Sequence, residues 1–561
     1  VAIFSLCSLV IDSPTTILLL QLPGYETAFP ITEQSNPITK NIDTSDPFQI
    51  VQFLKECDAE IFQEEDERIS NYKRLYSKSI LKAMADVAKK AQELLKEPDD
   101  NLIVLSGCGT SGRLAFLLAA PFVAGQLDLC INKLDKFTPV LVGFNPVNMA
   151  RSDNIEGWHS TFQQVAERIQ KLHDLHKGYI INPAIGPEAI AGSSRMKGGS
   201  TTKILLETIL LTAHKAVSDN SSITDRCLLD MLKSYEQVHK NIYSHSTKIA
   251  TLVKHAGASL QKNSHIYYIG WKSLGIIGII DASECVPTFG ADSSHVRGFV
   301  NNGFEEMANN NGDLSSLGPE FAISHEYFLK TVLPTIQEND TVVFIFTLDA
   351  SYLNNHACLS VVWQQICTKR IFLYNVSVNL QQQLEEIFSV AINVTWPKLL
   401  SEDQGSYIQR FQYELSTKWV LNAISTGAHV LKGKVYYNHM IDLRVSNSKL
   451  FGRALSLLQK FTGQSKSKCF EALLQSIYET DELNEEIKNV EISKHIQWAA
   501  TMNKVVPTAV VTLIRNCSVS EAKTRLASCP IVRDAINACM TGSGLKRTAE
   551  QRETDEKEPG E

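Results

Sequence analysis

The chain has 561 residues and a formal net charge of −7, and 44% of its residues are hydrophobic. This composition excludes a wholly disordered chain, and the mild negative charge gives no broad attraction to nucleic acid or anionic lipid. Twelve cysteines with no Cys-x-x-Cys pair are too sparse for a disulfide scaffold. We therefore expect an intracellular protein with no metal, no cofactor and no membrane-spanning helix.

The order of sequence patterns divides the chain into five segments. Residues 1–46 carry four prolines and few helix signals, which predicts an irregular arm. Residues 47–97 carry apolar residues at helical spacing. The predicted segments are an irregular N-terminal arm 1–46, a helical lead-in and first domain 47–225, a second domain 226–435, a helical lid 436–543 and a disordered tail 544–561.

Short β-branched runs alternate with helical stretches in the middle of the chain. The pattern starts near residue 102 and restarts near residue 264. The predicted strands cover residues 102–105, 139–144, 179–182, 265–269, 341–347, 370–374 and 390–394. Strands that alternate with helices predict parallel sheets, so the two tandem units indicate a duplicated, doubly wound α/β fold. From about residue 410 onward only helices are predicted.

A glycine-rich turn, Gly107 to Gly112, follows the first predicted strand and precedes a helix. Glycines let a ligand approach the backbone, and a helix start offers free N–H groups, so a phosphate would suit this turn. Thr110 and Ser111 would add hydroxyl donors. The turn lacks the lysine of a Walker A loop, and the acidic residue of a dinucleotide site is not evident. A tight turn without a ligand explains the glycines equally well.

Two further clusters could carry chemistry. Small, hydroxyl and basic residues fill positions 192–203, directly before a helix. We interpret them as a ligand-facing helix start, and the alternative is an ordinary helix cap with solvated lysines. Glu284 follows an apolar helix in the second domain. A buried Glu284 could accept sugar hydroxyls or act as a general acid, whereas a surface glutamate at a helix end is the more frequent case.

Three segments resemble sugar isomerase (SIS) domains. They are LSGCGTSGR from residue 105, NPAIGPEAIAGSSRMKGGSTTKILLET from residue 182 and DASECVPTFGADSSHVRGF from residue 281. More narrowly, they resemble the family that joins bacterial N-acetylmuramic acid 6-phosphate etherases with animal glucokinase regulatory proteins. The tandem repeat, the helical C-terminal region and the length are similar to the regulatory branch. Over residues 25–550 the resemblance implies two tandem SIS domains and an all-helical lid.

The resemblance also implies a function. It implies a non-catalytic regulator that binds and inhibits glucokinase, with inhibition promoted by fructose 6-phosphate and relieved by fructose 1-phosphate. Thr110 and Ser111 would hold the phosphate, Glu284 would contact the sugar hydroxyls, and Lys449 would reach in from the lid. Nucleic acid and membrane are not expected as partners, and a location in nucleus and cytoplasm is implied.

The expected contact with glucokinase is the segment Lys398, Leu399 and Leu400. This patch is apolar in the family, so Lys398 is a departure that is expected to weaken binding. The rival function is a lyase of the etherase type, which requires two acid–base groups to converge. In the etherases the GTSGR and DASEC motifs stand in one repeat, whereas here they are split between two. A purely structural adaptor is a third possibility, favoured if the first domain cannot bind a ligand.

One departure concerns the first domain. After Ala120 the chain passes directly to Pro121, where a SIS domain has further strands. Two βαβ units of about 30 residues each are missing, and with them a sugar-contacting glutamate and a serine-bearing phosphate loop of the family. The first sheet is therefore expected to lose central strands and to expose strand edges. We accordingly expect little or no sugar-phosphate response from this chain.

Overall fold

A computed structural model gives the structure of the chain. It describes residues 2–6, 30–64, 72–107, 122–150, 152, 159–307, 312–346, 370–375, 390–393, 405–529 and 531–541. These residues fall into two compact units, which we describe separately. The larger unit contains nearly everything up to Lys432, including both β-sheets, and the smaller unit contains the chain from Gly433 together with Pro287–Gly290.

The first sheet of the larger unit has four parallel strands in the order β2-β1-β3-β4. Their bounds are β1 (Ala2–Leu6), β2 (Ile103–Gly107), β3 (Thr138–Val142) and β4 (Tyr179–Ile181). The prediction of an irregular arm is wrong for β1, which pairs with β2 and β3 over its whole length. Its apolar sequence, with Ile3 and Phe4 at the centre, suits a strand.

Helices cover the first sheet and supply its core. Helix α5 (Phe122–Ile131) lies against β1 and β3, and α6 (Phe162–Asp174) lies against β3 and β4. Thr161 begins α6 with a reciprocal cap, because its hydroxyl accepts from the Gln164 backbone while the Gln164 side chain accepts from the Thr161 backbone. The buried side chains between these helices and the sheet are Leu127, Leu141, Ala150, Phe162, Val165, Ala166, Ile169 and Ile180.

The second sheet has five parallel strands in the order β6-β5-β7-β8-β9. Their bounds are β5 (Ile266–Gly270), β6 (Val296–Val300), β7 (Thr341–Phe346), β8 (Arg370–Asn375) and β9 (Val390–Asn393). Four of these strands were predicted. Strand β6 was missed because Arg297 and Gly298 interrupt its apolar run. Gly298 is required there because a Cβ atom would lie 2.6 Å from the backbone nitrogen of Ile279.

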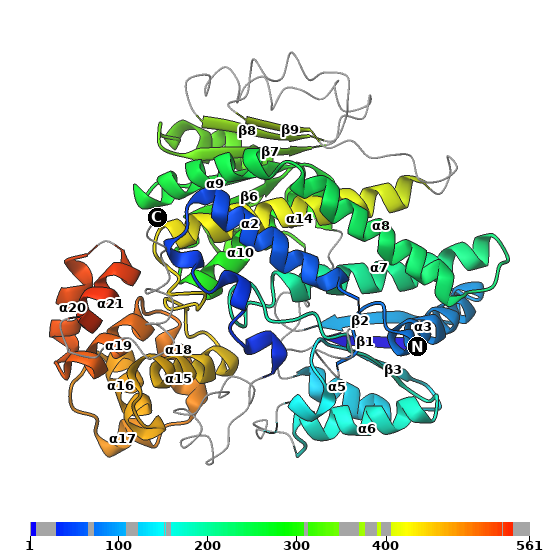
Figure 1. Ribbon diagram of the computed structural model, residues 1–561, viewed down its shortest axis with the longest axis horizontal. Coiled ribbons are helices and arrows are strands. Elements are labelled where there is room, and N and C mark those ends of the chain that lie inside the picture. Colours follow the sequence, from blue (N-terminus) through cyan, green and yellow to red (C-terminus); the bar gives the residue numbers. More distant parts are fainter. Residues whose placement is uncertain are drawn as a thin grey trace, which may run out of the picture. The chain divides into compact units, whose positions relative to one another are not determined.

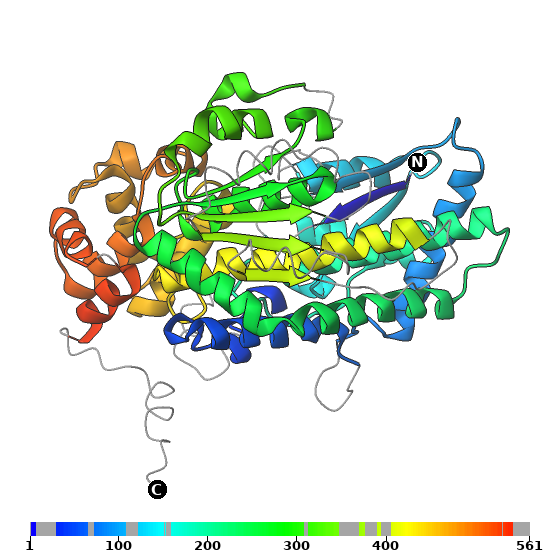
Figure 2. The ribbon, with the colours of Figure 1, turned by 90° about the horizontal axis from the view of Figure 1, so that it is seen from above.

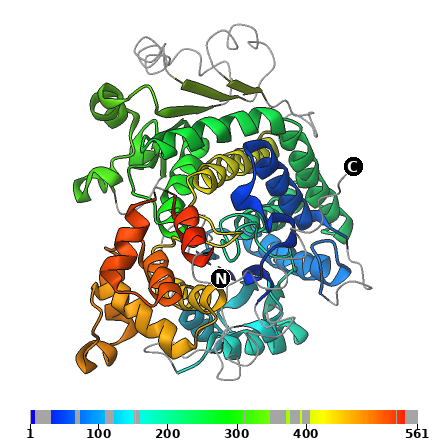
Figure 3. The same cartoon turned by 60° about the vertical axis from the view of Figure 1, so that its left-hand side comes forward.

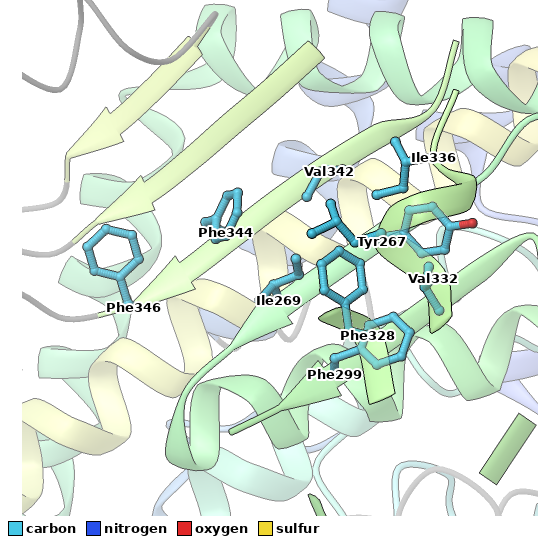
Figure 4. Close-up of a cluster of buried hydrophobic side chains, with 10 residues drawn as sticks. Tyr267, Ile269, Phe299, Phe328, Val332, Ile336, Val342, Phe344 and Phe346 are labelled. Atoms are coloured by element: carbon cyan, nitrogen blue, oxygen red, sulfur yellow. The ribbon is translucent and has the colours of Figure 1, made fainter. Parts of the chain in front are cut away.

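An aromatic core covers one face of the second sheet (Figure 4). Tyr267, Phe299 and Phe344 project from β5, β6 and β7 and are buried with Phe328 from the segment 325–336. The rings of Phe299 and Phe328 have centroids 5.0 Å apart. Helix α9 (Ser246–Gln261) lies against β5, β7 and β9. The sheet is therefore covered by apolar side chains as a buried parallel sheet requires.

The larger unit contains six further long helices and the three-residue helix α11 among its described residues. Their bounds are α2 (Pro47–Ala59), α3 (Lys78–Lys96), α7 (Lys197–Ser218), α8 (Asp225–Tyr243), α10 (Lys272–Phe289), α11 (His325–Tyr327) and α14 (Gly405–Leu431). Helix α14 packs on α9, α2, α7 and α8 (Figures 1 and 2). It therefore lies among helices that belong to both predicted domains.

The described part of the smaller unit is all-helical (Figure 3). Its helices are α15 (Ser448–Thr462), α16 (Lys466–Tyr478), α17 (Glu485–Lys488), α18 (Ile492–Ala499), α19 (Val505–Arg515), α20 (Val519–Ala527) and α21 (Val532–Thr541). Helix α19 packs against α15, α16, α20 and α21. These helices agree with the prediction that only helices follow residue 410. Over the described ranges of the chain, none of the helices meets the length and hydropathy of a bilayer-crossing segment.

Native-state hydrogen exchange is expected to show weaker protection in β2 than in β5. Strand β2 is an edge strand, and four of its five residues are only half-buried, whereas β5 is central and wholly buried. Amides at such an edge exchange through smaller openings. Mass spectrometry of peptides covering 103–107 and 266–270 measures the difference, and equal protection would show that the first sheet is as stable as the second.

Candidate functional site

Of the predicted site residues, the structure describes Glu284 and Lys449. Glu284 lies on α10 and is 4% exposed, so the alternative of a surface glutamate at a helix end is wrong. Lys449 is the second residue of α15 in the smaller unit and is partly exposed. Thr110, Ser111 and the segment 398–400 lie outside the described residues. Glu284 is therefore the buried residue around which a site can be sought.

Two buried cations accompany Glu284. Burial lowers the pKa of Lys418 to about 8, and the negative charges of Asp58 and Glu284 oppose this shift. Burial also acts to lower the pKa of Arg195, but Asp281, Cys285 and Glu284 outweigh it, so the pKa is raised. The charges of Arg195 and Lys418 therefore both act on Glu284 inside the larger unit.

Asp281 fixes the helix turn that precedes Glu284. Its side chain is 3% exposed and accepts four hydrogen bonds. The donors are Arg195 Nη1 at 3.2 Å, Asn422 Nδ2 at 2.7 Å and Ser425 Oγ at 3.1 Å on Oδ1, and Tyr268 Oη at 3.2 Å on Oδ2. These donors come from β5, α14 and the approach to α7. The position of Glu284 is thus set by three distant stretches of chain.

Lys418 joins α14 to the start of α7. Its Nζ atom donates to the carbonyl oxygens of Arg195 and Met196 at 2.8 and 3.2 Å, to Ser200 Oγ at 3.0 Å and to Asn422 Oδ1 at 2.8 Å. All of these acceptors are neutral and belong to the protein. The ammonium protons are therefore engaged, which leaves Lys418 poorly suited to act as a general acid.

The start of α7 is capped by a protein carboxylate. Glu188 is fully buried and accepts from the backbone N–H groups of Lys197 and Gly198, both at 2.9 Å. Lys197 is 0% exposed, and its Nζ donates to Glu60 Oε2 at 2.6 Å and to the Ile185 carbonyl at 2.9 Å. The alternative of solvated lysines is wrong. The first N–H groups of this helix serve an internal carboxylate instead of a ligand.

A second buried ion-pair cluster lies further along α7. Lys203 Nζ contacts Glu414 Oε2 of α14 at 2.5 Å and also bonds Glu207. Tyr235 of α8 donates to Glu207 Oε2 at 2.7 Å, and burial raises the pKa of Glu207 to about 7. Arg410 reaches Glu414 at 3.2 Å. Helix α14 is therefore bound to α7 through charged side chains at two places, at Lys418 and at the Lys203–Glu414 pair.

The equivalent turn of the second repeat is closed by packing. Gly270 ends β5, and a Cβ atom there would lie 2.4 Å from the Cα of Gly275 in α10. Glycine at this position therefore lets the end of the strand contact the start of the helix directly. Glu284 is thus a buried carboxylate of the larger unit on which the charges of Arg195 and Lys418 act.

The stability of the larger unit is expected to respond to pH through Glu207. Its pKa is raised when folded, so its contribution to stability is complete below about pH 4.5 and is lost as the pH rises through about 7. The variant Glu207→Gln lacks this titration. Its free energy of unfolding, relative to that of wild type, should therefore be higher at pH 8 than at pH 5 by on the order of 2 kcal/mol. Urea unfolding at both pH values measures this, with Glu97→Gln at an exposed position as the control. A pH-independent difference would contradict it.

Family models match three stretches of the chain. The N-terminal SIS domain of glucokinase regulatory protein matches residues 86–122, its second SIS domain matches 243–432, and its C-terminal lid domain matches 437–536. The first of these matches ends beside the junction of Ala120 and Pro121, where the sequence predicts missing strands.

The curated relatives extend this similarity over the whole length. The glucokinase regulatory protein of Xenopus laevis is 48% identical over 95% of this chain and 97% of the relative, and that of Homo sapiens is 47% identical over 94% and 95%. The alignment with the Xenopus laevis protein spans 600 residues, so it includes positions that this 561-residue chain lacks. The N-acetylmuramic acid 6-phosphate etherase of Trichodesmium erythraeum is 30% identical over 44% of this chain and 76% of the relative.

Among solved structures, the C-terminal domain of glucosamine-fructose-6-phosphate aminotransferase from Francisella tularensis matches with a TM-score of 0.37 and 11% identity, covering 69% of this chain and 97% of that chain. Similarity to the etherases is distant and partial, whereas similarity to the regulators covers nearly all of both chains. The chain belongs to the glucokinase regulatory protein family, and it is a regulator built from SIS domains and a helical lid.

Proposed function

We propose that this chain binds glucokinase and lowers its activity. The observation that carries the proposal is the near-complete alignment, at 45–48% identity, with four relatives named glucokinase regulatory protein. Similarity to the second SIS domain and to the lid domain is continuous along the chain. The segment 398–400, which the sequence assigns to partner contact, falls within the matched second SIS domain.

The proposal includes a sugar-phosphate site at Glu284. A buried carboxylate with Arg195 and Lys418 nearby suits the hydroxyl groups of a sugar, because a charged acceptor forms the stronger hydrogen bonds. Thr110 and Ser111 would hold the phosphate of the sugar. Fructose 6-phosphate would promote inhibition and fructose 1-phosphate would relieve it. Each would do so by binding more tightly to one of two arrangements of the protein, one that binds glucokinase and one that does not.

The shortened first domain sets the expected size of this response. We expect both fructose phosphates to change inhibition little in this chain, and clearly in a counterpart that carries the missing segment after Ala120. In that counterpart Glu284→Gln should weaken both responses and leave basal inhibition intact. A glucokinase activity assay with each sugar phosphate titrated tests this. If Glu284→Gln leaves both responses unchanged, the role given to Glu284 is wrong.

The etherase alternative predicts turnover, and we expect none on N-acetylmuramic acid 6-phosphate. Lys418 is poorly suited to serve as the second acid–base group beside Glu284, because its protons are engaged by protein acceptors. Product formation can be followed by chromatography over long incubation. Turnover that disappears in Glu284→Ala would overturn the regulatory assignment of this site.

A further inference from the structure

The two sheets allow an internal comparison of strand positions. In the second sheet β5 opens the repeat and pairs with β7, which pairs in turn with β8. In the first sheet β2 opens the repeat and pairs with β1, which pairs in turn with β3. Strand β1 therefore stands where the second repeat has β7. In both sheets the opening strand ends in a glycine that is paired with a residue of the neighbouring strand. Gly107 is opposite Leu6, and Gly270 is opposite Ile345.

The first repeat has too little chain to supply this strand itself. Residues 271–369 separate β5 from β8 in the second repeat, and they include β6 and β7. Only residues 108–137 separate β2 from β3 in the first repeat. The alignment with the Xenopus laevis relative contains positions that this chain lacks, and the match to the N-terminal SIS model ends at residue 122.

We propose that residues 2–6 replace the missing central strand, and that the space between β2 and β3 is a strand-accepting site that this segment fills. Without β1, the facing edges of β2 and β3 would each present unpaired backbone N–H and C=O groups. A parallel strand between them pairs both edges at once, as extended segments do when they add to a sheet. The sequence Ala-Ile-Phe-Ser-Leu suits this role because it has no proline and no charge.

Proline substitution in β1 tests the proposal. Phe4→Pro removes a backbone donor from the centre of a strand that is paired on both sides. We expect hydrogen exchange in residues 103–107 and 138–142 to accelerate at least tenfold, with β5 and β7 unchanged. Phe4→Val keeps the backbone donor and is the matched control, which should leave exchange near the wild-type rate. Unchanged protection of β2 and β3 in Phe4→Pro would overturn the proposal.

Cysteine trapping in the full chain tests the register independently of any loss of stability. Phe4 lies opposite Leu105, so the pair Phe4→Cys with Leu105→Cys places both thiols on the same face of the sheet. The pair Phe4→Cys with Val104→Cys places them on opposite faces. Under mild oxidation, peptide mapping should find the disulfide in the first pair and not in the second. No disulfide in the first pair, or equal yields in both, would contradict the proposed pairing.

Discussion

Replacing Asp281 by alanine is expected to lower the free energy of unfolding of the larger unit by about 3 to 5 kcal/mol. Asp281 is buried and accepts hydrogen bonds from Arg195, Asn422, Ser425 and Tyr268. Its removal leaves the guanidinium of Arg195, which is 2% exposed, without its salt-bridge carboxylate. Urea unfolding followed by tryptophan fluorescence measures the loss.

Two variants separate the charge from the general effect of substitution in this core. Asp281→Asn keeps an acceptor oxygen and should cost less than the alanine variant. Thr417→Val on α14 replaces a buried hydroxyl that has no hydrogen-bond partner among the residues that the structure describes, so it should be nearly neutral. An alanine variant within about 1 kcal/mol of wild type would show that the network does not hold α10 to α14.

The second large effect is expected in partner binding. Leu400→Asp should weaken glucokinase binding by about 30-fold or more, because a charge in an apolar contact removes a hot-spot interaction of at least about 2 kcal/mol. Leu399→Asp should act in the same direction. Lys398→Leu should strengthen binding, since it removes a charge from a contact that is proposed to be apolar. Surface plasmon resonance with immobilised glucokinase measures all three affinities.

A leucine elsewhere on the larger unit supplies the matched control. Leu317 is 64% exposed, so Leu317→Asp introduces the same charge at a solvent-facing leucine. It should bind glucokinase with wild-type affinity. Equal losses in Leu317→Asp and Leu400→Asp would attribute the effect to charge alone, and a wild-type affinity in Leu400→Asp would remove the segment 398–400 from the contact.

The hydrophobic pattern of the sequence predicts most of the strands and helices, and the strands that it misses have identifiable causes. Wholly apolar runs such as β5 and β7 are visible in the sequence because buried parallel strands are apolar on both faces. Strand β1 was missed because the prolines of residues 14–37 dominate the interpretation of the N-terminal region. Its place in the first sheet depends on pairing with β2 and β3, which lie far along the chain. A local sequence pattern could not indicate this pairing.

The candidate site divides in a similar way. Glu284 was found because its motif stands out, but its burial could not be told from the sequence. The partners of Lys197 and Arg195 come from Glu60 and Asp281, 137 and 86 residues away, so pairing inside the protein could not be distinguished from solvation or ligand binding. A usable signal did exist in α14. Its polar residues recur on one helical face, in the order Glu414, Lys418, Asn422 and Ser425.

The proposed inhibition of glucokinase is tested most directly by an activity titration. Glucokinase at fixed glucose is assayed with rising concentrations of the full chain, without sugar phosphate. We expect a saturable fall in glucokinase activity that Leu317→Asp retains and Leu400→Asp loses. Undiminished glucokinase activity at saturating concentrations of the folded chain, with no complex detected by size-exclusion chromatography, would contradict it.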